Sequence, residues 1–205
     1  MAPSNELRAF TGSWKFLFLL ALVGGALAVL VSFISPLCYS STVRVLVTQS
    51  VASDVDPFTA MKSAERVAGN LAEILHTSTF MDKILSDAPG FDASYFPSDD
   101  YSRRKLWTKT LESSAEPSTG FITIVTYHPD PAQAKILADA AAREIAAQTS
   151  SYFGDSVKAQ QIDAPLNSRW IARPHFLRNA LYGMIAGFLA GLAWVLIKTV
   201  RKKQG

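Results

Sequence analysis

Few residues in the 205-residue chain have the types and spacing that catalysis or metal binding requires. The three histidines, His76, His128 and His175, are far apart in the sequence and do not form the short-range pattern of a zinc site. Asp99 and Asp100 are adjacent carboxylates, but such neighbours at a helix start are more typical of capping than of acid–base catalysis. The nucleotide-binding G-x-x-x-x-G-K-S/T, metalloprotease H-E-x-x-H and nucleophile G-x-S-x-G motifs do not occur. We therefore expect no enzyme activity, no cofactor and no metal.

The single cysteine, Cys38, has no partner for a disulfide within the chain. It follows the first long apolar segment, where we interpret it as a small residue at a membrane surface. An intermolecular disulfide is the alternative.

Two long segments without charged residues indicate a membrane protein. Hydrophobic residues make up 49% of the chain, and the mean hydropathy is +0.16. Residues 16–34 and 179–197 carry no charge, and each is close to the roughly 20 residues that cross a bilayer as a helix. We predict transmembrane helices at residues 14–36 and 177–198. The first is expected to stay uncleaved, because its A-x-A triplet lies inside the apolar run rather than after it.

The basic residues are concentrated at the two ends of the chain. Residues 39–176 contain 13 Lys and Arg against 16 Asp and Glu, a net charge of −3, whereas residues 177–205 carry +5. This distribution is not that of a nucleic-acid-binding surface, so we expect no nucleic-acid partner. Lys and Arg near span ends favour the cytoplasmic side. The residues that set this orientation are Lys15, Arg201, Lys202 and Lys203. We expect a multi-pass protein of the plasma (inner) membrane with both termini in the cytoplasm.

The chain between the spans, residues 37–176, is expected to form an extracytoplasmic α/β domain. A cytoplasmic stub, residues 1–13, precedes the first span, and a basic cytoplasmic tail, residues 199–205, follows the second. Alternating valines from Val43 to Val47 predict a first strand. Apolar residues at helical spacing then predict three helices, the last of them in "SDDYSRRKLWTKTLESS".

The second half of this domain is predicted to form a strand–helix–strand unit. Residues 121–127 are β-branched and aromatic, and "HPDP" ends that strand. Asp130 can cap the following helix, and Pro131 suits its first turn. "VKAQQIDAP" predicts a further strand. A crossover of this kind makes its two strands parallel, with a right-handed connection. The expected order is β-α-α-α-β-α-β, with a mixed sheet.

The arrangement resembles the Wzz chain-length determinant family, the polysaccharide co-polymerases. The resemblance rests on "SSTVRVLVTQS" directly after the first span, on "ITIVTYHPDPAQAKILADAAAREI" with Asp130 and Pro131, and on a segment from Pro165 to Pro174 before a glycine-spaced second span. The helices are too short for the long arm of the large members. The chain also contains no kinase domain, so it resembles a short form.

The resemblance implies a membrane scaffold that regulates chain length, export or both in the biosynthesis of a capsule, an exopolysaccharide or an O-antigen. It implies ring-like homo-oligomers in the plasma membrane, with a polysaccharide polymerase or the nascent polysaccharide as partner. A separate tyrosine kinase is a further partner that the family allows, although the tail at residues 199–205 has no tyrosine. The alternatives are an extracytoplasmic sensor, a membrane-anchored enzyme, or an accessory subunit of another envelope complex.

Glycines recur on one face of the second span. Gly183, Gly187 and Gly191 are four residues apart, and the first span has its own small residues at Gly24 and Gly25. Small residues let transmembrane helices approach closely and gain dispersion contacts. We call Gly183, Gly187 and Gly191 the glycine ladder, and we expect it to pack on the first span of the same or of a neighbouring subunit. The alternative is a coincidence of spacing, because glycine is common in membrane helices.

Overall fold

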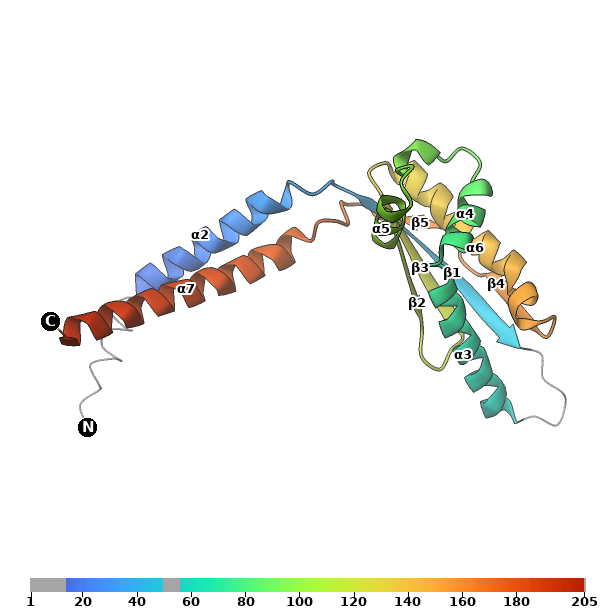
Figure 1. The fold of residues 1–205 in the computed structure, drawn as a ribbon. Coiled ribbons are helices and arrows are strands. Elements are labelled where there is room, and N and C mark those ends of the chain that lie inside the picture. The colour runs from blue at the N-terminus through green and yellow to red at the C-terminus, as the bar shows by residue number, and fades with distance from the viewer. Residues whose placement is uncertain (1–13, 50–55, 205) are drawn as a thin grey trace. The chain divides into compact units, whose positions relative to one another are not determined.

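The computed structural model describes residues 14–49 and 56–204, which fall into two compact units (Figure 1). One unit combines the chain up to Leu37 with the chain from Arg173 onward. The other is the continuous segment Cys38–Ala172. The predicted stub at residues 1–13 lies outside the described residues.

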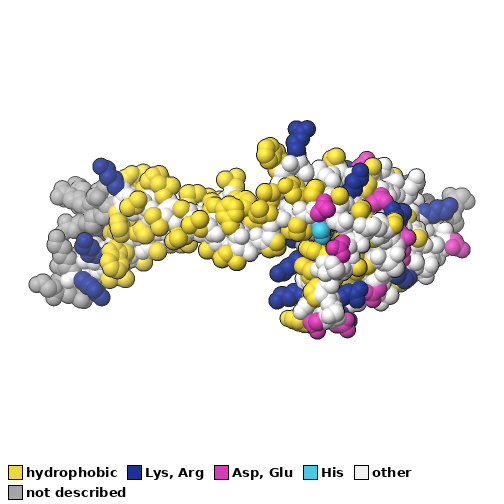
Figure 2. Space-filling view, turned by 90° about the horizontal axis from the view of Figure 1, so that it is seen from above, with side chains coloured by type: hydrophobic (Ala, Val, Ile, Leu, Met, Phe, Trp, Pro, Cys, Tyr) yellow, Lys and Arg dark blue, Asp and Glu magenta, His cyan; other side chains and the backbone are white. Residues whose placement is uncertain are grey.

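The first unit is a pair of helices, α2 (Trp14–Ser32) and α7 (Phe176–Gln204). The two helices run side by side in opposite directions (Figure 1). Both are long and apolar enough to cross a membrane. Hydrophobic side chains cover the outside of the pair (Figure 2). An apolar surface of this extent is typical of contact with lipid rather than with water. The helix α7 continues without a break into the basic tail.

The second unit contains a five-stranded sheet. The strands are β1 (Tyr39–Gln49), β2 (Leu111–Ala115), β3 (Phe121–His128), β4 (Val157–Gln161) and β5 (Leu166–Asn167). Their order is β2-β3-β1-β4, and β5 pairs with β1 beyond this path. The central strand β1 is the longest, and Val43 faces Ile124 of β3 in its register. The α/β class and the flanking apolar helices are thus confirmed.

The sheet is antiparallel, where the sequence predicted a mixed one. Each pairing in the described residues is antiparallel. The strands β3 and β4 do run in the same direction, as expected, because both pair in opposite sense with β1. The crossover through α6 carries the chain past β1 instead of to the adjacent position. The strands β3 and β4 are therefore parallel in direction, but they are not hydrogen-bonded to each other because β1 lies between them.

The helices of this unit are α3 (Pro57–Ile74), α4 (Ser78–Ser86), the short 3-10 helix η1 (Ala93–Tyr95), α5 (Asp100–Thr110) and α6 (Pro131–Phe153). A side-chain oxygen caps the first turn of each. Asp56 and Asp130, which precede prolines, accept from the backbone amides of Thr59 and Ala132. Such caps satisfy amide groups that the helix leaves unpaired.

The predicted helix in "SDDYSRRKLWTKTLESS" ends earlier than expected. It stops at Thr110, and the next five residues form β2 against β3. Leu111 is fully buried in the core, which fixes the start of the strand. The turn that follows has positive φ at Ser118 (61°) and Gly120 (70°). The serines of β2 hide the apolar alternation that marks a strand, so the sequence pattern gave no signal for it.

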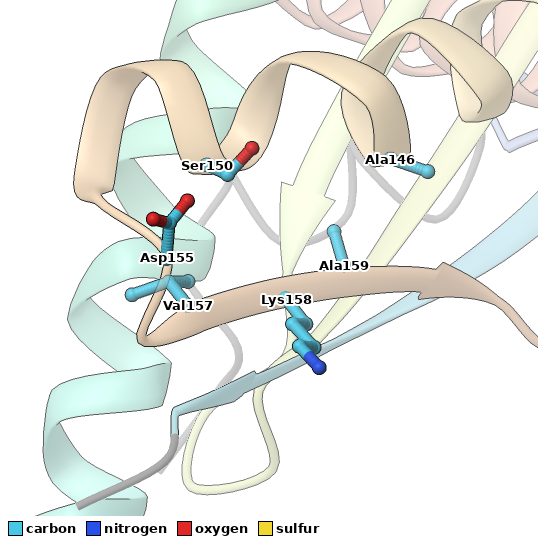
Figure 3. A pocket seen from close by; sticks show the side chains of 6 residues that line it. All are labelled: Ala146, Ser150, Asp155, Val157, Lys158 and Ala159. Carbon is cyan, nitrogen blue, oxygen red and sulfur yellow. The ribbon is translucent and has the colours of Figure 1, made fainter.

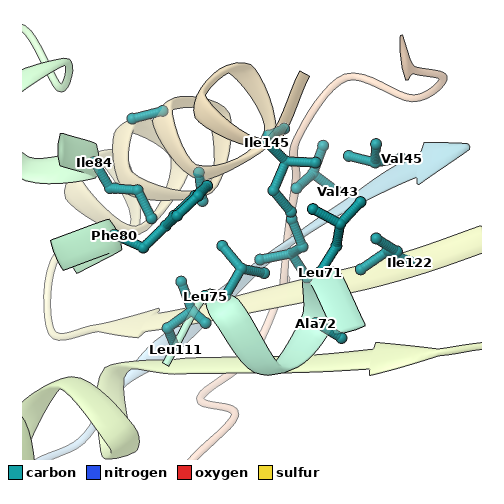
Figure 4. Packing of buried hydrophobic residues seen from close by; sticks show 14 of the residues in the cluster. Val43, Val45, Leu71, Ala72, Leu75, Phe80, Ile84, Leu111, Ile122 and Ile145 are labelled. Atoms are coloured by element: carbon teal, nitrogen blue, oxygen red, sulfur yellow. The ribbon is translucent and has the colours of Figure 1, made fainter. Parts of the chain in front are cut away.

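One face of the sheet and the helices enclose the hydrophobic core (Figure 4). Alternate residues of β1 and β3, such as Val43, Val45 and Ile122, point into it. Leu71 and Phe80 reach the same core from α3 and α4. The other side chains of β1 and β3 are half-buried or exposed. The period-2 pattern of the strands therefore gives a two-layer domain.

Candidate functional site

The glycines of α7 face α2 of the same chain. A Cβ atom built on Gly183 would overlap the carbonyl oxygen of Gly24, and one built on Gly187 would overlap the carbonyl oxygen of Leu20. A Cβ on Gly191 would lie 3.0 Å from Leu17 Cδ2. The first two clashes are with backbone atoms, which cannot rotate away. The close approach of the helices therefore requires glycine at positions 183 and 187.

The glycines of α2 complete the same contact from the other side. Gly24 packs against the backbone of α7, where a Cβ atom would come within 3.1 Å of Gly187 Cα. A Cβ atom on Gly25 would lie 2.7 Å from Cγ of Met184, a flexible side chain that can move. The structure thus brings the five singled-out glycines into one interface within the chain. The sequence left open whether these glycines pack on the first span of the same subunit or of a neighbouring one. In the structure they pack on α2 of the same subunit.

A polar contact joins the same two helices, and sequence reasoning missed it. Asn179 Nδ2 donates to Ser32 Oγ at 2.8 Å, and that hydroxyl donates to the carbonyl oxygen of Ala28 at 2.8 Å. Ser32 is buried. Hydrogen bonds between helices in lipid contribute about 0.6–2 kcal/mol. The signal was available: an antiparallel pair brings the last turn of the first span beside the first turn of the second.

The basic residues predicted to set the orientation lie at one end of the helix pair. Lys15 is in the first turn of α2, and Arg201 is near the end of α7, and both are exposed. Lys202 and Lys203 are also part of α7. Because the helices run in opposite directions, the start of α2 and the end of α7 share an end of the unit. Lys15 and Arg201 therefore lie at the same end of the helix pair, while Arg178 lies at the opposite end, in the first turn of α7.

The residues of the family-like motif stabilise turns and helix starts. Asp130 Oδ1 accepts from the amide of Ala132 at 2.8 Å, and the carbonyl of Pro131 accepts from Asn167 Nδ2 at 3.0 Å. Pro165 directly precedes β5. The carbonyl of Pro174, in the helix-pair unit, accepts from the amide of Phe176 at the start of α7. These contacts give the motif a structural role.

His128 lies in an aromatic cluster and has an unusual hydrogen-bond pattern. Its Nδ1 accepts from the backbone amide of Asp130 at 3.0 Å, so the other ring nitrogen that could take a partner is Nε2. That nitrogen is buried without a hydrogen-bond partner in the described residues. The ring centroid is 4.3 Å from that of Tyr95 and 5.8 Å from that of Phe91. Burial lowers the pKa of His128, so the ring stays neutral near pH 7.

A shallow pocket of about 400 Å³ lies between the end of α6 and β4 (Figure 3). Its polar lining side chains are Ser150, Asp155 and Lys158, and the lysine points away from the helix. The three polar side chains are one hydroxyl, one carboxylate and one ammonium group, and all three residues are exposed. In residues 14–49 and 56–204, no group of three or more His, Cys, Asp or Glu side chains is placed to hold a metal ion.

Comparison with known proteins matches the N-terminal part of the chain to one family. The family model described as Wzz, chain length determinant protein, matches residues 7–88. This stretch contains the first apolar helix, β1, α3 and α4. The resemblance inferred from the sequence is thereby confirmed for this part of the chain, while Asp130 and the later motif residues lie outside the match. No curated protein sequence matches the chain significantly.

Proposed function

Since residues 7–88 carry the chain length determinant domain of the Wzz family, we propose that this protein regulates the chain length, the export or both of a surface polysaccharide. The polymer would be a capsule, an exopolysaccharide or an O-antigen. The family match is the observation that carries the proposal. The two apolar helices that flank an α/β domain support it, because they fit a scaffold held in the membrane.

The proposed role is that of a scaffold rather than of an enzyme. The helix pair is held by packing contacts, in which the backbones of α2 and α7 touch at Gly24, Gly183 and Gly187. Contacts of this kind hold helices in a fixed geometry, as a scaffold requires.

The proposed location is the inner membrane, with the domain Cys38–Ala172 on the extracytoplasmic side. The basic end of the helix pair supports a cytoplasmic position of both termini. Partners in this arrangement are further copies of the chain and a polysaccharide polymerase or its nascent product, and a separate tyrosine kinase is a further candidate. Reporter fusions after Gly205 and within residues 87–98 should report opposite compartments. A C-terminal reporter that is active outside the cytoplasm would contradict this topology.

Deletion of the gene in its host tests the function. The expected result is an altered size distribution or amount of the surface polysaccharide, with sugar precursors still made, and restoration by the wild-type chain. Gel electrophoresis or size-exclusion chromatography of the extracted polymer measures this. An unchanged distribution would refute the proposal, as would turnover of an activated sugar by the purified protein alone.

A further inference from the structure

A three-residue tip interrupts an otherwise well-anchored segment between β5 and α7. We call it the tip, and it consists of Arg169, Trp170 and Ile171. Just before it, the amide of Ser168 donates to the carbonyl of Ser40 at 2.7 Å. Just after it, the amide of Ala172 donates to the carbonyl of Cys38 at 2.8 Å. Ser168 Oγ also accepts from the amide of Ser40 at 3.0 Å. The backbone on both sides of the tip is therefore fixed to the start of β1.

The side chains of the tip point into solvent although their backbone is anchored. Trp170 is 80% exposed and Ile171 is 39% exposed. Arg169 is exposed as well, and it forms no ion pair within the described part of the chain. Burial of a tryptophan is among the largest apolar gains available to a protein. The tip leaves Trp170 unburied although its backbone is anchored. We interpret its tryptophan and its cation as available to a partner outside the domain.

The length of the connecting chain limits where the tip can lie. Phe176, the first residue of α7, follows Trp170 by six positions. Six extended residues span at most about 20 Å. Because α7 is long and apolar enough to cross a membrane, Trp170 stays within this distance of the point where the helix meets the membrane surface. This limit is covalent and holds for every orientation of the domain.

The residue types of the tip match the chemistry of that surface. Tryptophan is enriched at the level of the lipid headgroups, because its ring is apolar and its N–H is polar. An arginine guanidinium binds phosphate oxygens in a bidentate manner. Isoleucine adds apolar area on the acyl side. A lipid surface therefore fits all three side chains, whereas a neutral sugar would leave the cation without a counter-charge.

We propose that the tip is a membrane contact of the domain. The side chains of Trp170 and Ile171 enter the boundary between headgroups and acyl chains, and Arg169 binds a lipid phosphate. The contact restrains the domain against the bilayer that the helix pair crosses. The membrane contact does not depend on which polymer the protein acts on. A test that refutes it therefore leaves the proposed function untouched, and the reverse also holds.

Fluorescence of the full chain in nanodiscs tests the proposal. The chain has four tryptophans, and the difference in emission between the wild type and Trp170→Phe isolates Trp170. Phenylalanine is tolerated there because the side chain is exposed. The expected difference spectrum is shifted to short wavelength, and it is lost when the discs contain lipids brominated near the headgroup.

The matched control places a tryptophan at the other end of the domain. Tyr152 is 47% exposed at the end of α6, and β1 spans about 30 Å between the two ends at roughly 3.3 Å per residue. Tyr152→Trp in the Trp170→Phe chain should give emission that brominated lipids do not quench. Solvent-like emission of Trp170 without lipid quenching would overturn the proposal. Shielding that appears only in discs with several copies would also overturn it, in favour of a contact between chains.

Discussion

Individual glycines determine how the two membrane helices meet. At Gly187 any side chain would run into the carbonyl of Leu20, so the clash cannot be relieved by a rotamer change. Gly187→Leu should therefore separate α2 from α7, at a cost of about 1–3 kcal/mol that is typical of overpacking. Membrane insertion should be unaffected, because leucine is at least as apolar as glycine.

Cysteines at positions 32 and 179 can report this separation. The side chains of Ser32 and Asn179 are within hydrogen-bond distance, so a pair of cysteines there should form a crosslink when Cys38 is replaced by alanine. Gly187→Leu should lower the crosslink yield, whereas Leu189→Ile, on an exposed position, should not. Equal yields for the two variants would show that the ladder does not set the approach of the helices.

Acid should weaken the domain through His128. Burial lowers the pKa of this histidine in the folded state, whereas the unfolded chain has the ordinary value of about 6.5. The unfolded state thus binds more protons below that value. Stability is fully present above pH 6.5 and falls as the pH drops through the unfolded and then the folded pKa.

The variant His128→Asn isolates this effect. Asparagine can keep the local bond to the amide of Asp130, but it does not titrate. The melting temperature of the wild type should fall between pH 7 and pH 5, and that of the variant should fall less. Carboxylates with a lowered pKa, such as Asp92 and Asp99, destabilise only at lower pH. Parallel melting curves for the two proteins over this range would contradict the assignment.

The β2–β3 hairpin depends on one close approach between elements. Gly120 has φ of 70°, and a Cβ atom there would lie 2.8 Å from the carbonyl oxygen of Val47. Gly120→Ala should destabilise the domain by about 1–3 kcal/mol, since it combines backbone strain with a clash. Gly69→Ala is the control, because that glycine lies within α3 with no atom within 4 Å of its added Cβ.

The two alanine variants should move in opposite directions. Alanine within a helix is more favourable than glycine by about 0.5–1 kcal/mol, so Gly69→Ala should stabilise the domain. Chemical denaturation of both variants measures the difference. A Gly120→Ala protein as stable as the wild type would show that the turn relaxes without cost.

The elements that the sequence predicted well have strong local signals. Apolar runs without charge predicted α2 and α7, the valines predicted β1, and the Asp–Pro pair predicted the start of α6. The short strand β2 was missed because its serines carry no apolar alternation. The strand order could not be predicted from local sequence patterns either, because β1 lies between β3 and β4 through pairings between residues far apart in the sequence.

The helix contact was predictable in part. Glycine spacing singled out Gly183, Gly187 and Gly191, but spacing alone does not say which helix fills the groove. The structure shows that α2 of the same chain packs against these glycines. The Asn179–Ser32 bond could be anticipated only from an antiparallel pairing of the two spans, because its residues are far apart in the sequence.

At the scale of the whole molecule, we propose that the protein is a membrane scaffold whose structure sets the length of a polysaccharide. Complementation of the gene-deletion strain tests whether the contact between α2 and α7 affects the polymer. Wild-type protein and Leu189→Ile should both restore the original size distribution. Gly187→Leu should restore it incompletely at equal protein level, because the packing of α2 on α7 is disturbed while the domain Cys38–Ala172 is intact.

The size distribution of the surface polysaccharide in these complemented strains is the most direct measurement. We expect the distribution with Gly187→Leu to lie between those of the deletion strain and the wild type, with polymer still produced in all strains. A distribution that is the same in the deletion strain and in every complemented strain would show that the protein does not set the length of the polysaccharide.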